Sequence, residues 1–241
     1  MQEMHLRLSR GTILRGRYVV MGALARGEFS SLYLVNDKQD NQKSFALKEL
    51  RNLGRKEQPR ILAEARMLKR LQHPALPDVH DLFSEGTNGP IYILFDYIKG
   101  SDLETLQLEQ PEQRFSLPQI VTLIAPIVEA VIYLHNQRPP IIHGNIKPSN
   151  IIVPESGTRT VLVNLGFAQE YDADTSIDDT RQDVSAYRAP EQYSKSGGIS
   201  QGTDIYALGA ILYTLFTGTV PADALALSLI HISEPTRQAE I

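Results

Sequence analysis

The period of the hydrophobic pattern changes near residue 100 of the 241 in this chain, and that change constrains the fold more than any other feature. Strand-like patterns dominate the first part, in residues 18–21, 31–35, 44–50, 79–83 and 91–95. Beyond residue 100 the apolar residues recur mainly at helical spacing, as in the long amphipathic segment 117–136. The sequence therefore predicts an α+β fold, with a small β-rich lobe followed by a larger α-rich lobe.

Three segments of the sequence predict helices. Apolar residues between 61 and 71 recur at helical spacing inside the β-rich lobe, and the His-Pro pair at 73–74 ends that helix. In the long helix of the second lobe, Pro126 is expected to cause a kink or a late start. Residues 204–217 predict an apolar helix that is buried on most sides. The boundary between the lobes is expected near residues 98–101.

Composition argues against several classes of protein. The chain has no Cys, which excludes disulfides and thiolate metal sites, fits a reducing cytosol and favours a cytoplasmic location. Its formal net charge of -4 argues against a general binder of nucleic acid or anionic membranes. Residues 1–20 lack the apolar stretch of a secretory signal. The best apolar run, at 206–216, is shorter than the roughly eighteen residues of a membrane span, so no membrane segment is expected.

Three residues of the first lobe are candidates for binding a nucleotide. Gly27 lies in a turn between two strands, where backbone N–H groups could cover phosphates, although an ordinary hairpin has the same pattern. Lys48 on the third strand could hold phosphates as a point charge, but exposed strand positions also commonly carry Lys. Glu64 in the helix could pair with Lys48, and its alternative is a solvated helix face. Each signal is weak by itself.

The order of these pieces is more specific than any one of them. The glycine turn, strand Lys, helical Glu and His-Pro pair are followed by Ile-His-Gly-Asn-Ile-Lys-Pro-Ser-Asn at 142–150. Asn-Leu-Gly then occurs at 164–166, Ala-Pro-Glu at 189–191 and an apolar helix from residue 204. This ordered set resembles the protein kinase family from residue 18 to about residue 221, and implies the bilobal protein-kinase-like fold.

The resemblance also implies a division of the chain and a site for ATP. The expected segments are an N-terminal extension at 1–16, the N-lobe at 17–97, a partial C-lobe at 98–226 and an unrelated tail at 227–241. Phe95 stands at the gatekeeper position before the hinge. The residues expected to line the ATP site are Leu24, Gly27, Leu32, Ala46, Lys48, Glu64, Phe95, Asp96, Ile98 and Ile152.

The residues that perform phosphoryl transfer in this family are changed. The resemblance places Asn145 at the position of the catalytic Asp, and an amide cannot accept a proton near neutral pH. Asn164 replaces the metal-binding Asp of the Asp-Phe-Gly motif, and its neutral oxygen is a poorer Mg²⁺ ligand than a carboxylate. The second metal position, Asn150, is kept, as is Lys147, which in the family reaches the transferred phosphate. Mg²⁺ binding is therefore expected to be weak or absent.

Two neighbouring positions point the same way. Gly144 replaces the Arg that would read an activation-loop phosphate, and Val184 replaces a Thr that contacts the catalytic residues. We therefore interpret the chain as a pseudokinase that binds ATP or a regulatory protein partner. One alternative is an active kinase that transfers the ATP γ-phosphate to a protein substrate, since losing single catalytic groups commonly leaves some rate. The other is an interaction scaffold that binds no nucleotide.

Ser/Thr rather than Tyr specificity also follows from the resemblance. Lys147 comes two residues after the catalytic position, and Gln192 follows the Ala-Pro-Glu motif as in bacterial members. The acidic segment 170–183 is expected to be an exposed loop. Its Thr175, Ser176 and Thr180 are candidates for phosphorylation by a partner kinase, and the alternative is a solvated loop without that role.

The end of the chain does not resemble the family. Residues 227–237 match the conceptual translation of a transposon-type sequencing adapter, and the alternative is a divergent natural tail. The natural protein is expected to continue with further helices. Without them Glu191 would lack its usual Arg partner, and the helix at 204–217 would keep an uncovered apolar face. The 241-residue chain is therefore expected to be poorly stable and prone to aggregate.

Overall fold

The chain folds into two compact units, one comprising Met1–Gln72 and Pro77–Ile98, the other His73–Leu76 and Lys99–Ile241. The first unit is rich in strands and the second in helices, so the predicted α+β fold class is confirmed. The computed structural model describes residues 8–26, 30–40, 43–51, 57–85, 89–165, 169–170, 186–193, 198–224 and 226. The side chains of residues 57, 60, 64, 169 and 170 lie outside this description.

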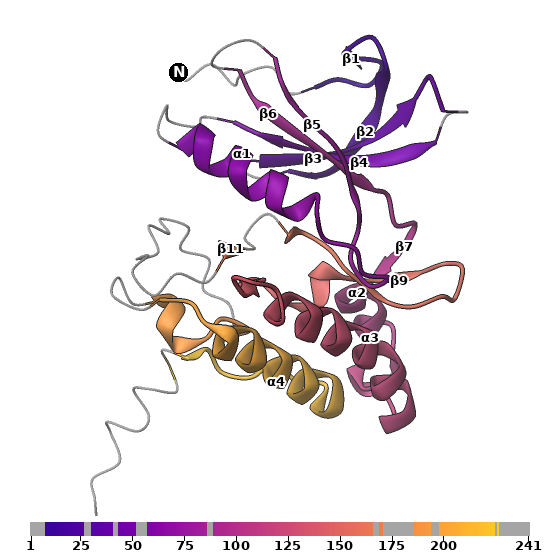
Figure 1. Cartoon of the computed structure of the whole chain (residues 1–241). Coiled ribbons are helices and arrows are strands. Elements are labelled where there is room, and N and C mark those ends of the chain that lie inside the picture. The colour runs from indigo at the N-terminus through magenta and orange to yellow at the C-terminus, as the bar shows by residue number, and fades with distance from the viewer. Residues whose placement is uncertain are drawn as a thin grey trace, which may run out of the picture. The chain divides into compact units, whose positions relative to one another are not determined.

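Six antiparallel strands form the sheet of the first unit, in the order β1-β2-β3-β4-β6-β5 (Figure 1). The strands are β1 (Ile13–Leu14), β2 (Tyr18–Arg26), β3 (Ser30–Asp37), β4 (Ser44–Leu50), β5 (Val79–Ser84) and β6 (Ile91–Asp96). The helix α1 (Glu57–Leu68) packs against β5. The five predicted strands correspond to β2, β3, β4, β5 and β6, and β1 was not expected.

Alternation along these strands directs every second side chain into one aromatic core. Phe83 stacks on Tyr92 and Tyr18, with ring centres 5.1 Å and 6.0 Å apart. The buried residues of this core are Leu14, Tyr18, Val20, Tyr33, Val35, Phe45, Leu47, Phe83, Tyr92 and Leu94. Because successive strand residues point to opposite faces, Ala46 and Lys48 of β4 lie on the face away from this core.

Among the described residues, the second unit contains two long α-helices, one short α-helix, three 3₁₀ turns and two small antiparallel sheets. The helices are α2 (Leu103–Leu108), α3 (Leu117–His135) and α4 (Gln201–Thr217), with 3₁₀ turns η1 (Pro111–Gln113), η2 (Pro148–Asn150) and η4 (Pro190–Tyr193). The strands are β7 (Gly100–Asp102), β8 (Ile141–Ile142), β9 (Ile151–Pro154), β10 (Val161–Leu162) and β11 (Gln169–Glu170). They pair as β10-β9-β7 and β11-β8, and α3 packs along α4 (Figure 1).

Helix α3 begins at Leu117, where Gln119 Oε1 accepts hydrogen bonds from the backbone N and the hydroxyl of Ser116. The helix continues through Pro126, so the predicted late start does not occur. By length and composition α3 could cross a membrane, which the run at 206–216 could not. Its buried stripe packs instead against α4, β8 and β10, as in a core helix. The stripe comprises Ile120, Ile124, Ile127, Ala130, Val131 and Leu134.

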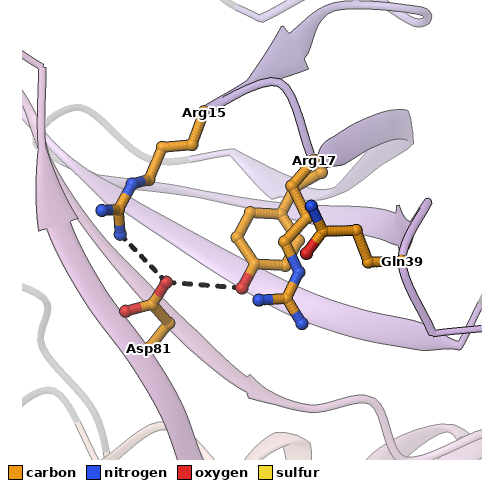
Figure 2. A pocket seen from close by; sticks show the side chains of 5 residues that line it. Arg15, Arg17, Gln39 and Asp81 are labelled. Carbon is orange, nitrogen blue, oxygen red and sulfur yellow. Dashed lines mark hydrogen bonds and ion pairs between the residues drawn. The ribbon is translucent and has the colours of Figure 1, made fainter.

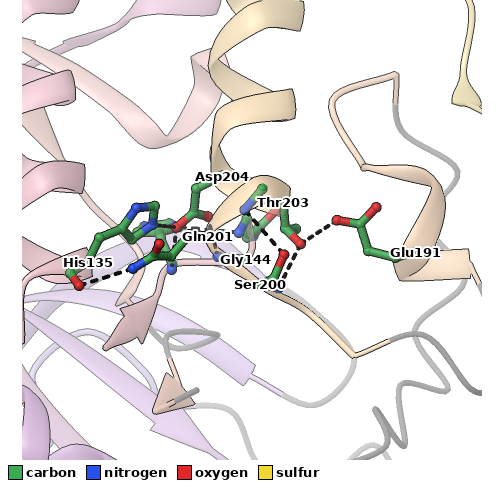
Figure 3. Close-up of polar contacts among 10 residues, drawn as sticks. His135, Gly144, Glu191, Ser200, Gln201, Thr203 and Asp204 are labelled. Carbon is green, nitrogen blue, oxygen red and sulfur yellow. Dashed lines mark hydrogen bonds and ion pairs between the residues drawn. The ribbon is translucent and has the colours of Figure 1, made fainter. Parts of the chain in front are cut away.

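Helix α4 is capped at its N-terminus by Ser200, whose hydroxyl accepts from Gly202 N at 3.2 Å, and at its C-terminus by Gly218, which has φ +73°. The helix is predicted to be buried on most sides. One side of it is buried, but Ile205 and Phe216 are exposed on the other. Glu191, which is expected to lack its usual Arg partner, accepts a hydrogen bond at its Oε1 from Thr203 Oγ1 at 2.6 Å (Figure 3).

Candidate functional site

A single buried carboxylate organises the loop that follows β8. Asp204, at the start of α4, is 1% exposed. Its Oδ2 accepts from His143 N at 2.9 Å, and its Oδ1 accepts from Gly144 N at 2.8 Å. His135 Nε2, at the end of α3, lies 2.9 Å from the same carboxylate (Figure 3). The side chain of Asp204 therefore fixes the backbone of the loop against both long helices.

Gly144 occupies a conformation that other residues adopt at a cost. Its φ is +69°, which glycine reaches without a steric penalty. Its carbonyl oxygen accepts from Gln192 Nε2 at 2.8 Å, while Gln192 Oε1 accepts from Ala189 N at 3.0 Å. Gly144 is thus held at its N–H by α4 and at its carbonyl by the segment that contains Ala-Pro-Glu.

Asn145, at the predicted catalytic position, is held through its backbone. Its N–H donates to His143 Nδ1 at 3.3 Å, and its carbonyl oxygen accepts from Asn150 Nδ2 at 2.8 Å. Asn150 belongs to η2 and is buried. These bonds fix where Asn145 lies, and its amide side chain is only partly buried.

Asn150 and Asn164, the two predicted metal positions, lie next to each other. Asn164 Nδ2 donates to Asn150 Oδ1 at 3.4 Å. Asn164 has φ +67°, a left-handed conformation that Asn adopts more readily than most residues. The backbone of Val163 donates to Asn150 O at 2.9 Å and so aligns the two segments. The structure therefore brings together three of the predicted site residues, Asn145, Asn150 and Asn164.

This pair of amides does not fit a magnesium ion. Mg²⁺ sites in proteins usually include at least one carboxylate, and both side chains here are neutral. The oxygen of Asn150 also already accepts a hydrogen bond from Asn164. Across the described ranges, no group of three or more His, Cys, Asp or Glu side chains could hold a metal ion.

Lys147 lies immediately before η2, in an extended conformation, and is partly buried. The backbone of Asn150 donates to its carbonyl oxygen at 2.9 Å, which ties Lys147 to the amide pair through the main chain. Its predicted role of contacting a transferred phosphate stays a prediction.

Four predicted ATP-site residues lie on one face of the first unit's sheet. Lys48 pairs with Leu32 across β3 and β4, and Ala46 pairs with Phe95 across β4 and β6. All four point away from the aromatic core, because directly paired residues share a face. Lys48 is 8% exposed, so the residue is buried and does not occupy an exposed strand position.

The remaining ATP-site candidates are less clearly placed. Leu24 is exposed next to a bulge in β2. The Asp96 carboxylate is occupied within its own unit, where Oδ2 accepts from Asp78 N at 3.1 Å and Oδ1 lies 2.6 Å from His80 Nε2. Ile98 is partly buried at the end of the first unit, and Ile152 pairs with Val161 and Asp102 in the second.

Several predicted residues fall outside the description. Gly27, Val184, Thr175, Ser176 and Thr180 are not among the described residues, and neither is the side chain of Glu64. The tail at 227–241 also lies outside. The roles assigned to these residues stay predictions.

Sequence reasoning missed two residues that hold the catalytic loop. The sequence marks Gln192 only as a feature of bacterial members, although its amide links Ala189 to Gly144. The role of His135 cannot be read from the sequence, because it lies 69 positions from Asp204 and no local pattern connects the two. The sequence signal for Gln192 is its place directly after Ala-Pro-Glu.

Comparison with known proteins identifies a family. The protein kinase domain matches residues 18–235. Serine/threonine-protein kinase 36 of Pongo abelii is 30% identical over 227 residues, covering 92% of this chain and 16% of the relative. Serine/threonine-protein kinase PrkC of Bacillus subtilis is 28% identical over 239 residues, covering 95% of this chain and 35% of the relative.

A third relative has a more specific name. The DNA damage-responsive serine/threonine-protein kinase RqkA of Deinococcus radiodurans is 30% identical over 220 residues, covering 89% of this chain and 32% of the relative. The chain therefore spans about a third or less of the length of these relatives.

Proposed function

Because the chain belongs to the protein kinase family, we propose that it is a Ser/Thr-type kinase domain whose phosphoryl transfer is impaired. In this proposal the domain binds ATP with little help from Mg²⁺ and acts by engaging a regulatory protein partner. Its compartment is the cytoplasm, which the lack of cysteine favours. The substrates and partners of the whole protein belong to the proposal too, since the chain spans only part of its relatives.

The observation that carries the proposal is the hydrogen-bonded pair of Asn150 and Asn164. Kinases neutralise the charge that develops on the transferred phosphoryl group with metal ions held at these positions. Two neutral amides that bond to each other supply no charge to hold such an ion. Replacing the carboxylate thus weakens the metal-based electrostatic stabilisation on which phosphoryl transfer depends.

Asn145 supports the same conclusion through a different step, the deprotonation of the attacking hydroxyl. The family uses an Asp there to orient the attacking hydroxyl and accept its proton. The backbone of Asn145 is fixed by His143 and Asn150, so its amide side chain starts from a defined position. An amide can orient a hydroxyl by accepting a hydrogen bond, but it cannot take the proton.

The binding surfaces, in contrast, keep their residues. Lys48 is largely buried on the face of β4 that carries Ala46, and it pairs in register with Leu32. Lys48 stands at the strand position that the family uses to hold nucleotide phosphates, so retaining it favours a role in binding an anionic nucleotide. Retained binding residues and lost catalytic residues together favour a protein that binds without turnover.

The test is γ-phosphate transfer from ATP in the presence of Mg²⁺. We compare the natural chain with the double variant Asn145→Asp/Asn164→Asp, each with and without Lys48→Ala. We expect transfer from the restored variant alone, and its loss with Lys48→Ala. Transfer by the natural chain that depends on Lys48 would contradict the proposal.

A second candidate function is a slow but active kinase, which the ordered backbone around Gly144 and Asn145 favours. Positioning alone preserves part of the rate when a catalytic group is lost. The same assay separates the two functions. A shift in melting temperature with ATP, measured without Mg²⁺, also separates both of them from a scaffold that binds no nucleotide.

A further inference from the structure

A cavity outside the predicted ATP and catalytic residues lies in the first unit. Its volume is about 250 Å³, and Arg15, Arg17, Tyr18, Gln39 and Asp81 line it (Figure 2). The lining comes from the turn after β1, the start of β2, the turn after β3 and the middle of β5. Its lining carries two positive side chains and one negative, and a second carboxylate, that of Asp37, pairs with Arg17 beside it.

Arg17 is held rigidly before any ligand arrives. Its Nε donates to both oxygens of Asp37 at 2.9 Å, and its Nη2 donates to Oδ2 at 2.6 Å. Its Cζ also lies 5.1 Å from the centre of the Tyr18 ring. Within the described part of the chain, Nη1 takes no part in a hydrogen bond. A guanidinium fixed in this way loses little conformational entropy when its remaining edge binds.

Arg15 is placed over the cavity by a strained turn. Its φ is +50°, followed by +66° at Gly16, and Arg17 N closes the turn by donating to Leu14 O at 3.0 Å. A left-handed conformation is uncommon for a residue with a side chain, and such strain is concentrated at functional positions. The guanidinium lies 5.2 Å from the Phe83 ring centre, and only its Nη1 is bonded among the described residues.

The carboxylate oxygens that line the cavity already accept hydrogen bonds. Asp81 Oδ2 accepts from Arg15 Nη1 at 3.2 Å and from the Tyr18 hydroxyl at 3.3 Å, while Oδ1 accepts from Leu82 N at 2.8 Å. The Gln39 side-chain amide makes no hydrogen bond within the described residues, and Figure 2 shows it beside Arg17. The cavity thus presents more unused donors than unused acceptors, which is the chemistry that recognises an oxyanion.

We propose that this cavity binds a small oxyanion of phosphate or carboxylate chemistry, held by the free edges of Arg15 and Arg17 and by the Gln39 amide. The volume exceeds that of a phosphate ion, so an organic group attached to the anion would lie against the Tyr18 ring. The site is independent of the proposed function, because none of its residues belongs to the ATP or catalytic set.

The test is an NMR titration of the ¹⁵N-labelled chain with sodium phosphate and, separately, with sodium acetate. Ionic strength is held constant with sodium chloride, and the backbone amides of Gly16 and Gln39 are followed. We expect saturable shifts with one of the two anions, and which one it is distinguishes phosphate from carboxylate ligands. Shifts that stay linear, or that chloride reproduces, overturn the proposal.

Variants identify the residues responsible. Arg15→Gln removes one guanidinium and should weaken binding about tenfold, the usual loss for a charge-assisted hydrogen bond. Arg114→Gln is the matched control, because Arg114 is also 54% exposed and also paired with a carboxylate, Glu112 at 3.5 Å. Equal weakening by both variants would reduce the effect to net charge and overturn the site.

Gln39→Ala is a second test of the site, which stays valid if Arg15→Gln changes the backbone of the turn at residues 14–17. Gln39 side-chain atoms make no hydrogen bonds within the described residues, so removing them should leave the fold unchanged. We expect affinity to fall about threefold, as for a neutral hydrogen bond. Unchanged affinity in Gln39→Ala, together with unchanged affinity in Arg15→Gln, would show that the anion binds elsewhere.

Discussion

At the scale of single residues, Asp37 shows how a buried carboxylate links the first unit's stability to pH. The Arg17 guanidinium holds the pKa of Asp37 below its ordinary value of 3.8, although burial acts in the opposite direction. Since the folded-state pKa is the lower one, the pair stabilises the fold fully above that ordinary value. The contribution is lost as the pH falls from about 3.8 through the folded-state pKa.

We therefore expect Asp37→Asn to lower the free energy of unfolding by about 2 kcal/mol at pH 7, because charge-assisted hydrogen bonds are lost. The difference from the natural chain should shrink at pH 3. Urea unfolding at the two pH values measures it. Asp40→Asn, at an exposed position of the same turn, is the control and should have little effect. A difference of equal size at both pH values would contradict the assignment.

The side-chain amide of Gln192 bridges two backbone segments of the second unit. Its amide must donate to Gly144 O and accept from Ala189 N at once, which a carboxylate cannot do. We expect Gln192→Glu to shift the NMR resonance of the Asn145 amide and to lower the free energy of unfolding by about 1–3 kcal/mol.

Gln137→Glu is the matched control for Gln192→Glu. Gln137 Nε2 also donates to a backbone carbonyl, that of Tyr133 at 2.9 Å, but within its own helix end. It should leave the Asn145 resonance in place. If both variants shift that resonance equally, or neither does, Gln192 does not position the catalytic loop.

At the scale of elements, a glycine inside helix α4, Gly209, and the glycine that caps its C-terminal end, Gly218, have opposite roles. Gly209 lies on the exposed side of the helix, and a Cβ built there would meet nothing within 4 Å. Gly218 ends the helix with φ +73°, and a Cβ there would collide with the backbone carbonyl of Glu112. Substitution by alanine should therefore change stability in opposite directions in the middle of α4 and at its C-terminal cap.

We expect Gly209→Ala to raise the free energy of unfolding by about 0.5–1 kcal/mol, because alanine restricts the unfolded chain and favours helix. Gly218→Ala should lower it by more than about 1 kcal/mol, since the left-handed conformation and the collision both oppose a side chain. Thermal unfolding followed by circular dichroism measures both. The idea fails if Gly218→Ala is as stable as the natural chain.

At the scale of the whole molecule, local patterns predicted elements well and contacts poorly. The pattern at 31–35 falls inside β3, and the predicted helix at 117–136 matches α3, because each depends on residues a few positions apart. The ordered motifs likewise located Asn145, Asn150 and Asn164. The tie between Asp96 and His80 and the bridge from Gln192 to Gly144 could not be predicted, because they join distant segments.

Which side of a helix stays exposed also depends on distant segments, and the outer side of α4 carries exposed apolar side chains. Ile205, Tyr213 and Phe216 are 58%, 50% and 46% exposed on the outer side of α4. A contiguous exposed apolar stripe favours association between molecules. We expect the chain to self-associate as its concentration rises, and Ile205→Gln/Phe216→Gln to reduce this association in sedimentation velocity. Ile132→Gln, at a similarly exposed apolar position on α3, should change it little. A natural chain that stays monomeric across the concentration range would refute the stripe's role.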